Sequence, residues 1–226
     1  MKKKAIFGVG GLARELYYQL LDKNIVFFVD DDFICDSKKI DNKPIYPISD
    51  FNSLNYELII AVSDPLVRNK IVSKLPADTS FWSFIHSSVE LNNTIKLGKG
   101  SILMKNAILT TSIEIGDFAI IHSFVVVAHD CVIGDYFCAT YGAKVSGNVK
   151  IGMNFFMGSN SSIRENITIC DNVKLGIGSV VVKNINYTGK YIGVPFKKLY
   201  VFKISNLIFN IHFHIVFNQN FNYFLN

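Results

Sequence analysis

A repeat of six residues constrains this chain more than any other feature. From Ile95 to Ile185 every sixth residue is small or apolar, and the residue two places after it is also apolar almost throughout. Such a short period is typical of β-helices, whose strands turn alternate side chains into a common interior. The repeat positions are Ile95, Ser101, Ala107, Ile113, Ala119, Val125, Cys131, Phe137, Ala143, Val149, Phe155, Ser161, Ile167, Val173, Ser179 and Ile185.

Glycines recur in the same register, each directly after an inner apolar residue, at Gly98, Gly116, Gly134, Gly152 and Gly176. We expect glycine and asparagine to occupy the corners between strands, where a positive φ is needed. A sandwich of short strands would instead need hairpin turns at irregular spacings, and the sequence has none. Residues 85–199 are therefore predicted to form a parallel β-helix.

The segment before the β-helix, 1–84, has a different pattern, in which apolar runs alternate with amphipathic stretches. The runs at 5–7, 25–29 and 58–62 predict strands, and the stretches at 14–21 and 65–75 predict helices. This alternation favours a small Rossmann-like α/β domain with a parallel sheet. We therefore divide the chain into an α/β domain (1–84), a β-helix (85–199) and an apolar tail (200–226).

The tail carries a single charge, Lys203, among many Phe, Ile and Asn residues. It has no apolar run that approaches the roughly 20 residues of a membrane-spanning helix, so stable membrane insertion is not expected. We expect the tail to pack on the end of the β-helix or on a neighbouring subunit. Contact with a membrane surface and disorder are the alternatives.

Composition excludes several classes of function. The net charge of +5 is small and the basic start, Lys2 to Lys4, is typical of a solvated end, so no nucleic-acid partner is expected. No apolar stretch of signal-peptide length follows this start, which favours the cytoplasm. The cysteines form no CxxC pair and no metal-ligand spacing with histidine, so reduced thiols and no metal are predicted. They are Cys35, Cys131, Cys138 and Cys170.

Five segments carry a resemblance to a known family: 7–15 (FGVGGLARE), 29–32 (VDDD), 128–135 (AHDCVIGD), 142–152 (GAKVSGNVKIG) and 193–197 (GVPFK). They resemble the hexapeptide-repeat N-acetyltransferases of nucleotide-linked amino sugars, to which the sialic acid O-acetyltransferases are close. The resemblance implies a left-handed β-helix, a homotrimer, and acetyl-CoA as co-substrate between the β-helices of adjacent subunits. The implied reaction is acetylation of a nucleotide-linked 4-amino-4,6-dideoxy sugar for surface glycan biosynthesis.

Acetylation of an amine needs a base whose pKa lies near neutrality, and histidine is suited to this role. His86, His122 and His129 lie in or near the repeats, and His129 stands at the family's base position. The resemblance implies that His129 is the general base and that Asp130 orients its ring. Because neighbours on a strand point to opposite faces, these two side chains can meet only if a corner intervenes.

The resemblance also implies coenzyme contacts at Cys138, Gly147, Ser159 and Ile177. A backbone N–H at Gly147 would stabilise the oxyanion of the tetrahedral intermediate. Cys138 replaces a histidine of the bacillosamine-pathway enzymes, so a polar contact is weakened or absent there. No histidine is placed in an obvious way to activate Cys131 or Cys138, so covalent catalysis is not expected.

A glycine-rich segment, 8–11, lies between the first predicted strand and helix, where backbone N–H groups can bind a phosphate. Acidic residues follow at the spacing of a dinucleotide fold, but eighty residues are short for that fold. The alternative is a glycine turn that only joins strand to helix. The resemblance implies contacts with the nucleotide part of a sugar substrate from Gly10, Gly11, Leu12, Asp30 and Asp31.

Other functions share the β-helix, so the fold alone does not determine the chemistry. A zinc carbonic anhydrase would need three histidine ligands with a His-x-x-x-x-His pair, whereas His122 and His129 are seven positions apart. O-acetylation of a sialic acid would use the same base on a hydroxyl. A non-catalytic scaffold would tolerate replacement of His129 and Asp130.

Overall fold

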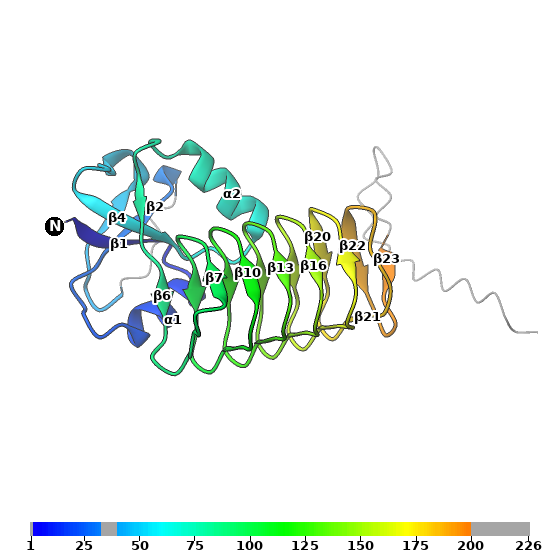
Figure 1. Ribbon diagram of the computed structural model, residues 1–226. Coiled ribbons are helices and arrows are strands. Elements are labelled where there is room, and N and C mark those ends of the chain that lie inside the picture. Colours follow the sequence, from blue (N-terminus) through cyan, green and yellow to red (C-terminus); the bar gives the residue numbers. More distant parts are fainter. Residues whose placement is uncertain (1, 33–39, 200–226) are drawn as a thin grey trace, which may run out of the picture.

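The computed structural model describes residues 2–32 and 40–199; the tail at 200–226 and Cys35 lie outside the described residues. The chain folds into an α/β domain that lies against one side of a long parallel β-helix (Figure 1). This arrangement confirms the predicted fold class, a small parallel-sheet domain followed by a left-handed β-helix. Within the described ranges no helix is long and apolar enough to cross a membrane.

The α/β domain contains a five-stranded parallel sheet in the order β3-β2-β1-β4-β5. The sheet's two faces are apolar because one packs with α1 toward the β-helix and the other packs under α2. The elements are β1 (Lys3–Phe7), α1 (Gly11–Gln19), β2 (Val26–Val29), β3 (Ile45–Pro47), the 3₁₀ turn η2 (Ile48–Asp50), β4 (Tyr56–Ile60), α2 (Pro65–Lys74) and β5 (Ser80–Phe81).

Two details of this domain differ from the prediction. Helix α1 begins three residues earlier than expected, because Gly10 takes the N-cap position in extended conformation. The sequence also showed no sign of β3 and β5, since strands of two or three residues are too short to show a period. Both strands lie at the edges of the sheet.

The β-helix has three faces, and one coil spans three repeats, so that Ile113 pairs with Ile95. The first face contains β6 (Phe84–Ile85), β8 (Ile102–Leu103), β11 (Ile120–Ile121), β14 (Cys138–Ala139), β17 (Phe156–Met157), β20 (Val173–Leu175), β22 (Gly189–Ile192) and the antiparallel β23 (Lys197–Leu199). The second contains β9 (Ile108–Leu109), β12 (Val126–Val127), β15 (Lys144–Val145), β18 (Ser162–Ile163) and β21 (Val180–Val181). The third contains β7 (Ile95–Leu97), β10 (Ile113–Ile115), β13 (Val132–Ile133), β16 (Lys150–Ile151) and β19 (Thr168–Ile169).

The interior of the β-helix is built from the repeat positions that the sequence predicts. Residues from Ala107 to Ile185 at these positions, and the apolar residues two places after them, form one continuous buried cluster. Ser161 and Ser179 take the same inward position and are fully buried. Burial of this long apolar column is the main source of the β-helix's stability.

The recurring glycines do not have the role that we expected, because none of them has a positive φ. They are instead required by the close approach of successive coils: a Cβ at Gly116 or Gly152 would lie 2.1 Å from an aspartate oxygen of the next coil. Other glycines, Gly100, Gly142 and Gly178, do take left-handed corners, as expected. The remaining left-handed corners are taken mainly by asparagine and, at some coils, by Ser, Asp, Phe or Tyr. They include Asn106, Ser112, Phe118, Phe124, Asp130, Tyr136, Asn148, Asn154, Asn160, Asn166 and Asn172.

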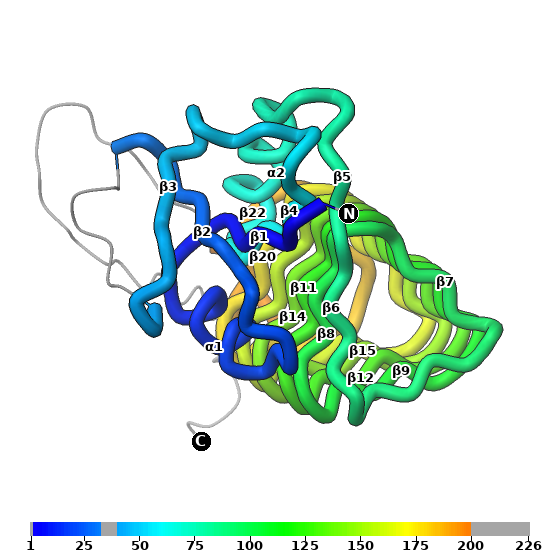
Figure 2. Tube along the Cα trace, turned by 90° about the vertical axis from the view of Figure 1, so that its left-hand side faces the viewer, coloured from blue at the N-terminus to red at the C-terminus, as the bar shows by residue number. Residues whose placement is uncertain are grey.

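The α/β domain covers the first face of the β-helix, as the view along the β-helix in Figure 2 shows. The outward residues Ile102, Ile120 and Cys138 of this face are buried in one cluster with Leu12 and Leu16 of α1. A polar contact fixes the same interface. Arg68 of α2 is fully buried and donates five hydrogen bonds to carbonyl oxygens, two in the loop before α2 and three on the β-helix.

Candidate active site

His129 and Asp130 lie together at the corner between the second and third faces, where β12 leads into β13. Asp130 has a φ of 60°, so the chain turns between the two residues and both side chains lie on the same side. His129 Nδ1 is 2.8 Å from Asp130 Oδ2. Because a carboxylate can only accept, Nδ1 carries the proton and Nε2 keeps a free lone pair. Both side chains are about 60% exposed, so the lone pair is open to a substrate.

Gly147 lies directly under the His129 ring, one coil further along the β-helix. A Cβ at this position would be 2.5 Å from His129 Cε1 and 2.7 Å from Nε2, so only glycine leaves room for the ring. The Asn148 N–H donates to the His129 carbonyl, which fixes the two coils at this corner. In residues 2–32 and 40–199 the Gly147 N–H has no acceptor. The Gly147 backbone therefore lies beside the imidazole with its N–H unpaired in that part of the chain.

Ser159 and Ile177 lie at a different corner, between the first and second faces. They are one coil apart and so occupy equivalent places on successive coils; Ile177 is 81% exposed. Ser159 Oγ is 3.2 Å from Thr140 Oγ1, the corner residue of the preceding coil. Since the second face separates this corner from His129, one chain brings Gly147 to the predicted base but not Ser159 and Ile177.

Cys138 is placed unfavourably for a coenzyme contact. Its side chain has no exposed surface and packs between the β-helix and the α/β domain. Burial raises the pKa of the thiol to about 11, which also argues against a nucleophilic role. Its side chain is therefore part of the domain interface. Cys131 is buried as well, and burial raises the pKa of its thiol.

The glycine segment ends at the N-terminus of α1, which carries no side-chain cap and no acidic residue in its first turn. Added Cβ atoms at Gly10 and Gly11 would meet nothing within 4 Å, so the space beside this helix end is open. Leu12 is buried in the core, so only its backbone can face a ligand. This end of α1 can bind a negatively charged group through its N–H groups and dipole.

Asp30 and Asp31 follow β2, at the sheet edge from which the glycine segment also emerges. Both are exposed, and Asp31 Oδ1 accepts a hydrogen bond from the Ser49 N–H at 3.1 Å. Carboxyl ends of neighbouring parallel strands are the usual place for nucleotide contacts in an α/β sheet. The structure therefore brings these two residues to the same edge as Gly10 and Gly11.

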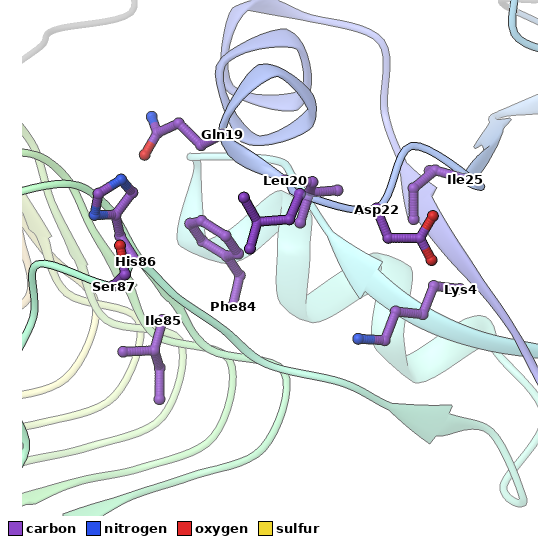
Figure 3. Close-up of a pocket in the computed structure, with 10 residues that line it drawn as sticks. Lys4, Gln19, Leu20, Asp22, Ile25, Phe84, Ile85, His86 and Ser87 are labelled. Carbon is purple, nitrogen blue, oxygen red and sulfur yellow. The ribbon is translucent and has the colours of Figure 1, made fainter.

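The described surface includes two hollows that bear on the site. The first, of about 400 Å³, lies between the end of α1 and β6, is lined by Gln19, Phe84 and His86 among others, and contains none of the predicted site residues (Figure 3). The second, of about 340 Å³, lies on the third face and is lined in part by Asp130. Across the described part of the chain, no three His, Cys, Asp or Glu residues gather as a metal site would require.

The sequence analysis missed several residues that the structure brings into prominence. Arg68 falls on the buried side of α2, three residues from Pro65 and three from Ile71, and a charge in such a place is a signal that could have been used. Glu15 and Tyr141 are hydrogen-bonded across the domain interface although 126 residues separate them. No sequence pattern predicts that contact.

Residues 3–75 match the PglD N-terminal domain family. No curated protein matches the sequence of the chain.

Several solved structures share the whole architecture. The acetyltransferase domain of PglB from Neisseria gonorrhoeae FA1090, in complex with acetyl coenzyme A, is 25% identical, with a TM-score of 0.77 over 88% of this chain and 100% of that one. WeeI from Acinetobacter baumannii AYE is 26% identical, with a TM-score of 0.74 over 88% and 100%. PerB from Caulobacter crescentus, in complex with CoA and GDP-perosamine, is 24% identical, with a TM-score of 0.77 over 88% and 98%.

Proposed function

We propose that this chain, which shares its architecture with sugar acetyltransferases, transfers an acetyl group from acetyl-CoA to the amine of a nucleotide-linked 4-amino-4,6-dideoxy sugar. The observation that carries this proposal is the His129–Asp130 pair above Gly147. Acetyl coenzyme A in the PglB domain, and CoA with GDP-perosamine in PerB, support the choice of substrates. No metal is required for this reaction.

In the proposed mechanism the sugar amine attacks the thioester carbonyl of acetyl-CoA while His129 Nε2 accepts a proton from the nitrogen. The new C–N bond forms a tetrahedral intermediate, whose oxyanion receives a hydrogen bond from the Gly147 N–H. The C–S bond then breaks, and the proton held by His129 passes to the departing CoA thiolate. Asp130 keeps the imidazole in the tautomer that leaves Nε2 free and stabilises the imidazolium that forms.

We propose that the complete site forms between subunits of a homotrimer. His129 lies on one edge of the second face, whereas Ser159 and Ile177 lie on the other edge. If two β-helices pack side by side, the base of one subunit meets the coenzyme contacts of the next. Exposed apolar residues at the second face and its edges favour such packing; they include Ile108, Phe124 and Ile177.

We assign the nucleotide part of the sugar substrate to the α/β domain (1–84) and acetyl transfer to the β-helix (85–199). The open N-terminus of α1 would bind the diphosphate through Gly10, Gly11 and the backbone of Leu12. Asp30 and Asp31 would contact the nucleoside. The product would enter surface glycan biosynthesis from the cytoplasm.

The proposal is tested by incubating the purified protein with acetyl-CoA and a panel of UDP-, dTDP- and GDP-linked 4-amino sugars plus free sialic acid, with CoA thiol release as the readout. We expect release with one nucleotide amino sugar and its loss in His129→Ala. His86→Ala is the matched control, because His86 is only half-buried and, among the described residues, its side chain hydrogen-bonds only to Ser88 nearby. Turnover with sialic acid alone would make the enzyme an O-acetyltransferase, and no turnover with any acceptor would favour a scaffold.

A further inference from the structure

A polar cluster joins the two domains at the corner between the first and second faces of the β-helix. The Tyr141 hydroxyl donates to Glu15 Oε2 of α1 at 2.5 Å. The Tyr141 ring lies against the His122 ring, with centroids 4.7 Å apart and a tilt of 53° between the planes. None of these three residues has a part in the transfer step described above.

His122 is the unusual member of this cluster. The residue is 5% exposed, and neither ring nitrogen has a hydrogen-bond partner among the described residues. Burial lowers the pKa of the imidazole, so near neutral pH the ring offers one donor and one acceptor. Buried polar groups without partners are rare and destabilising, so both ring nitrogens of His122 remain available to a hydrogen-bonding partner.

The position of the cluster relates it to the proposed sugar substrate, and the inference therefore rests on that proposed function. Glu15 follows Gly11 by four residues, so it lies about 6 Å along α1 from the end that would bind the diphosphate. That distance is the scale of one hexose ring. His122 also belongs to the same coil as His129. In a trimer whose threefold axis runs parallel to the β-helices, equivalent coils of adjacent subunits lie at the same height, so the cluster of one subunit would lie level with His129 of the next.

We propose that Glu15, Tyr141 and His122 form the subsite that holds the hexose ring of the acceptor, with Tyr141 as its movable cover. Tyr141 is 40% exposed and is tied to Glu15 only through its hydroxyl, so its ring can rotate away from His122. The uncovered imidazole then hydrogen-bonds one sugar hydroxyl, and the freed Glu15 carboxylate accepts from another. The aromatic ring packs against the apolar C–H face of the sugar.

His122→Leu is the first test, because leucine fills a similar volume without polar atoms. We expect KM for the nucleotide amino sugar to rise about tenfold, the value of one lost hydrogen bond, with KM for acetyl-CoA unchanged. The melting temperature should stay equal or rise, since an unpaired buried polar group has been removed. A structural residue would give the opposite result, a lower melting temperature with an unchanged KM, and that outcome overturns the proposal.

Tyr141→Phe and Glu15→Gln complete the kinetic test, and His86→Leu is the matched control, because His86 is a half-buried histidine two coils earlier at the same corner. Glu15→Gln should raise KM for the sugar, whereas Tyr141→Phe should not raise it, because it removes only the bond that holds the cover closed and keeps the aromatic ring. The control should leave KM unchanged. A rise in KM for acetyl-CoA alone would assign the cluster to the coenzyme and refute the sugar subsite.

Calorimetry separates this inference from the proposed function. Wild type should bind the sugar nucleotide more tightly than the corresponding nucleoside diphosphate, and His122→Leu should lose that difference while binding the nucleoside diphosphate normally. Loss of turnover with this difference intact would refute only the transfer reaction. Equal affinities of wild type and His122→Leu for the sugar nucleotide would refute the subsite.

Discussion

The buried guanidinium of Arg68 provides the most direct test of how the two domains are held together. Its Nε and terminal nitrogens donate to the carbonyls of Val62 and Ser63 before α2, and to those of Phe118, Tyr136 and Phe137 on the β-helix. No carboxylate pairs with it at salt-bridge distance in the described part of the chain. Replacement by methionine removes every donor and the charge but fills much of the same volume.

The magnitude follows from the carbonyls that are left behind. Four of the five accept no other hydrogen bond within the described ranges, since only the Phe137 carbonyl also accepts from Ile120 N–H. Each buried acceptor without a partner costs about 1 kcal/mol or more. Burial lowers the pKa of Arg68 to about 10, which reflects the cost of burying a cation that has no carboxylate partner. The methionine variant avoids this cost, and that gain offsets part of the loss. We therefore expect Arg68→Met to lower the free energy of unfolding by about 3 kcal/mol.

Urea unfolding followed by tryptophan fluorescence measures this loss, at one fixed protomer concentration because an oligomer's stability depends on it. Trp82 is the chain's single tryptophan, and it is buried with its indole N–H bonded to the Ala5 carbonyl, so it reports on the α/β domain. Arg164→Met is the matched control on the surface, with an expected change below about 0.5 kcal/mol. If both variants unfold at the same urea concentration as wild type, the carbonyl argument is wrong.

Three further predictions concern the corners of the β-helix. Gly147→Ala should lower kcat about 100-fold, because its Cβ displaces the His129 ring; a steady-state assay with unchanged kcat would contradict the packing. Asp130→Asn should keep the fold, since asparagine tolerates a φ of 60°, but lower kcat about 10- to 100-fold through loss of the carboxylate; equal melting temperatures and full activity would exclude an orienting role. The pKa of His122 is lower in the folded than in the unfolded state, so the unfolded chain binds more protons and stability falls as pH drops through 6.5 and below. Melting curves of His122→Leu should lack this fall, and parallel curves for both proteins would count against it.

The six-residue period determined the β-helix by itself. Each strand of the repeat is so short that it turns only two side chains inward. The apolar positions of the sequence therefore correspond directly to the interior of the β-helix. The alternation of strand and helix in the α/β domain was equally readable, because its core strands are continuous apolar runs. The corners were harder to predict. The five recurring glycines were expected to adopt a positive φ, but they are required because neighbouring coils approach closely.

The candidate site depended much more on tertiary structure. Sequence neighbours are not spatial neighbours in general, and His129 and Asp130 meet only because a left-handed corner falls between them. Residues that a family pattern brings together can be buried by a second domain, as the side chain of Cys138 is by α1. Glu15 and Tyr141 meet through docking of one domain on another, as the carbonyls around Arg68 do. The six-residue repeat determines which side chains each coil buries in the interior. Contacts between the two domains depend instead on which outer surfaces of the folded β-helix are apolar, and the repeat does not determine these.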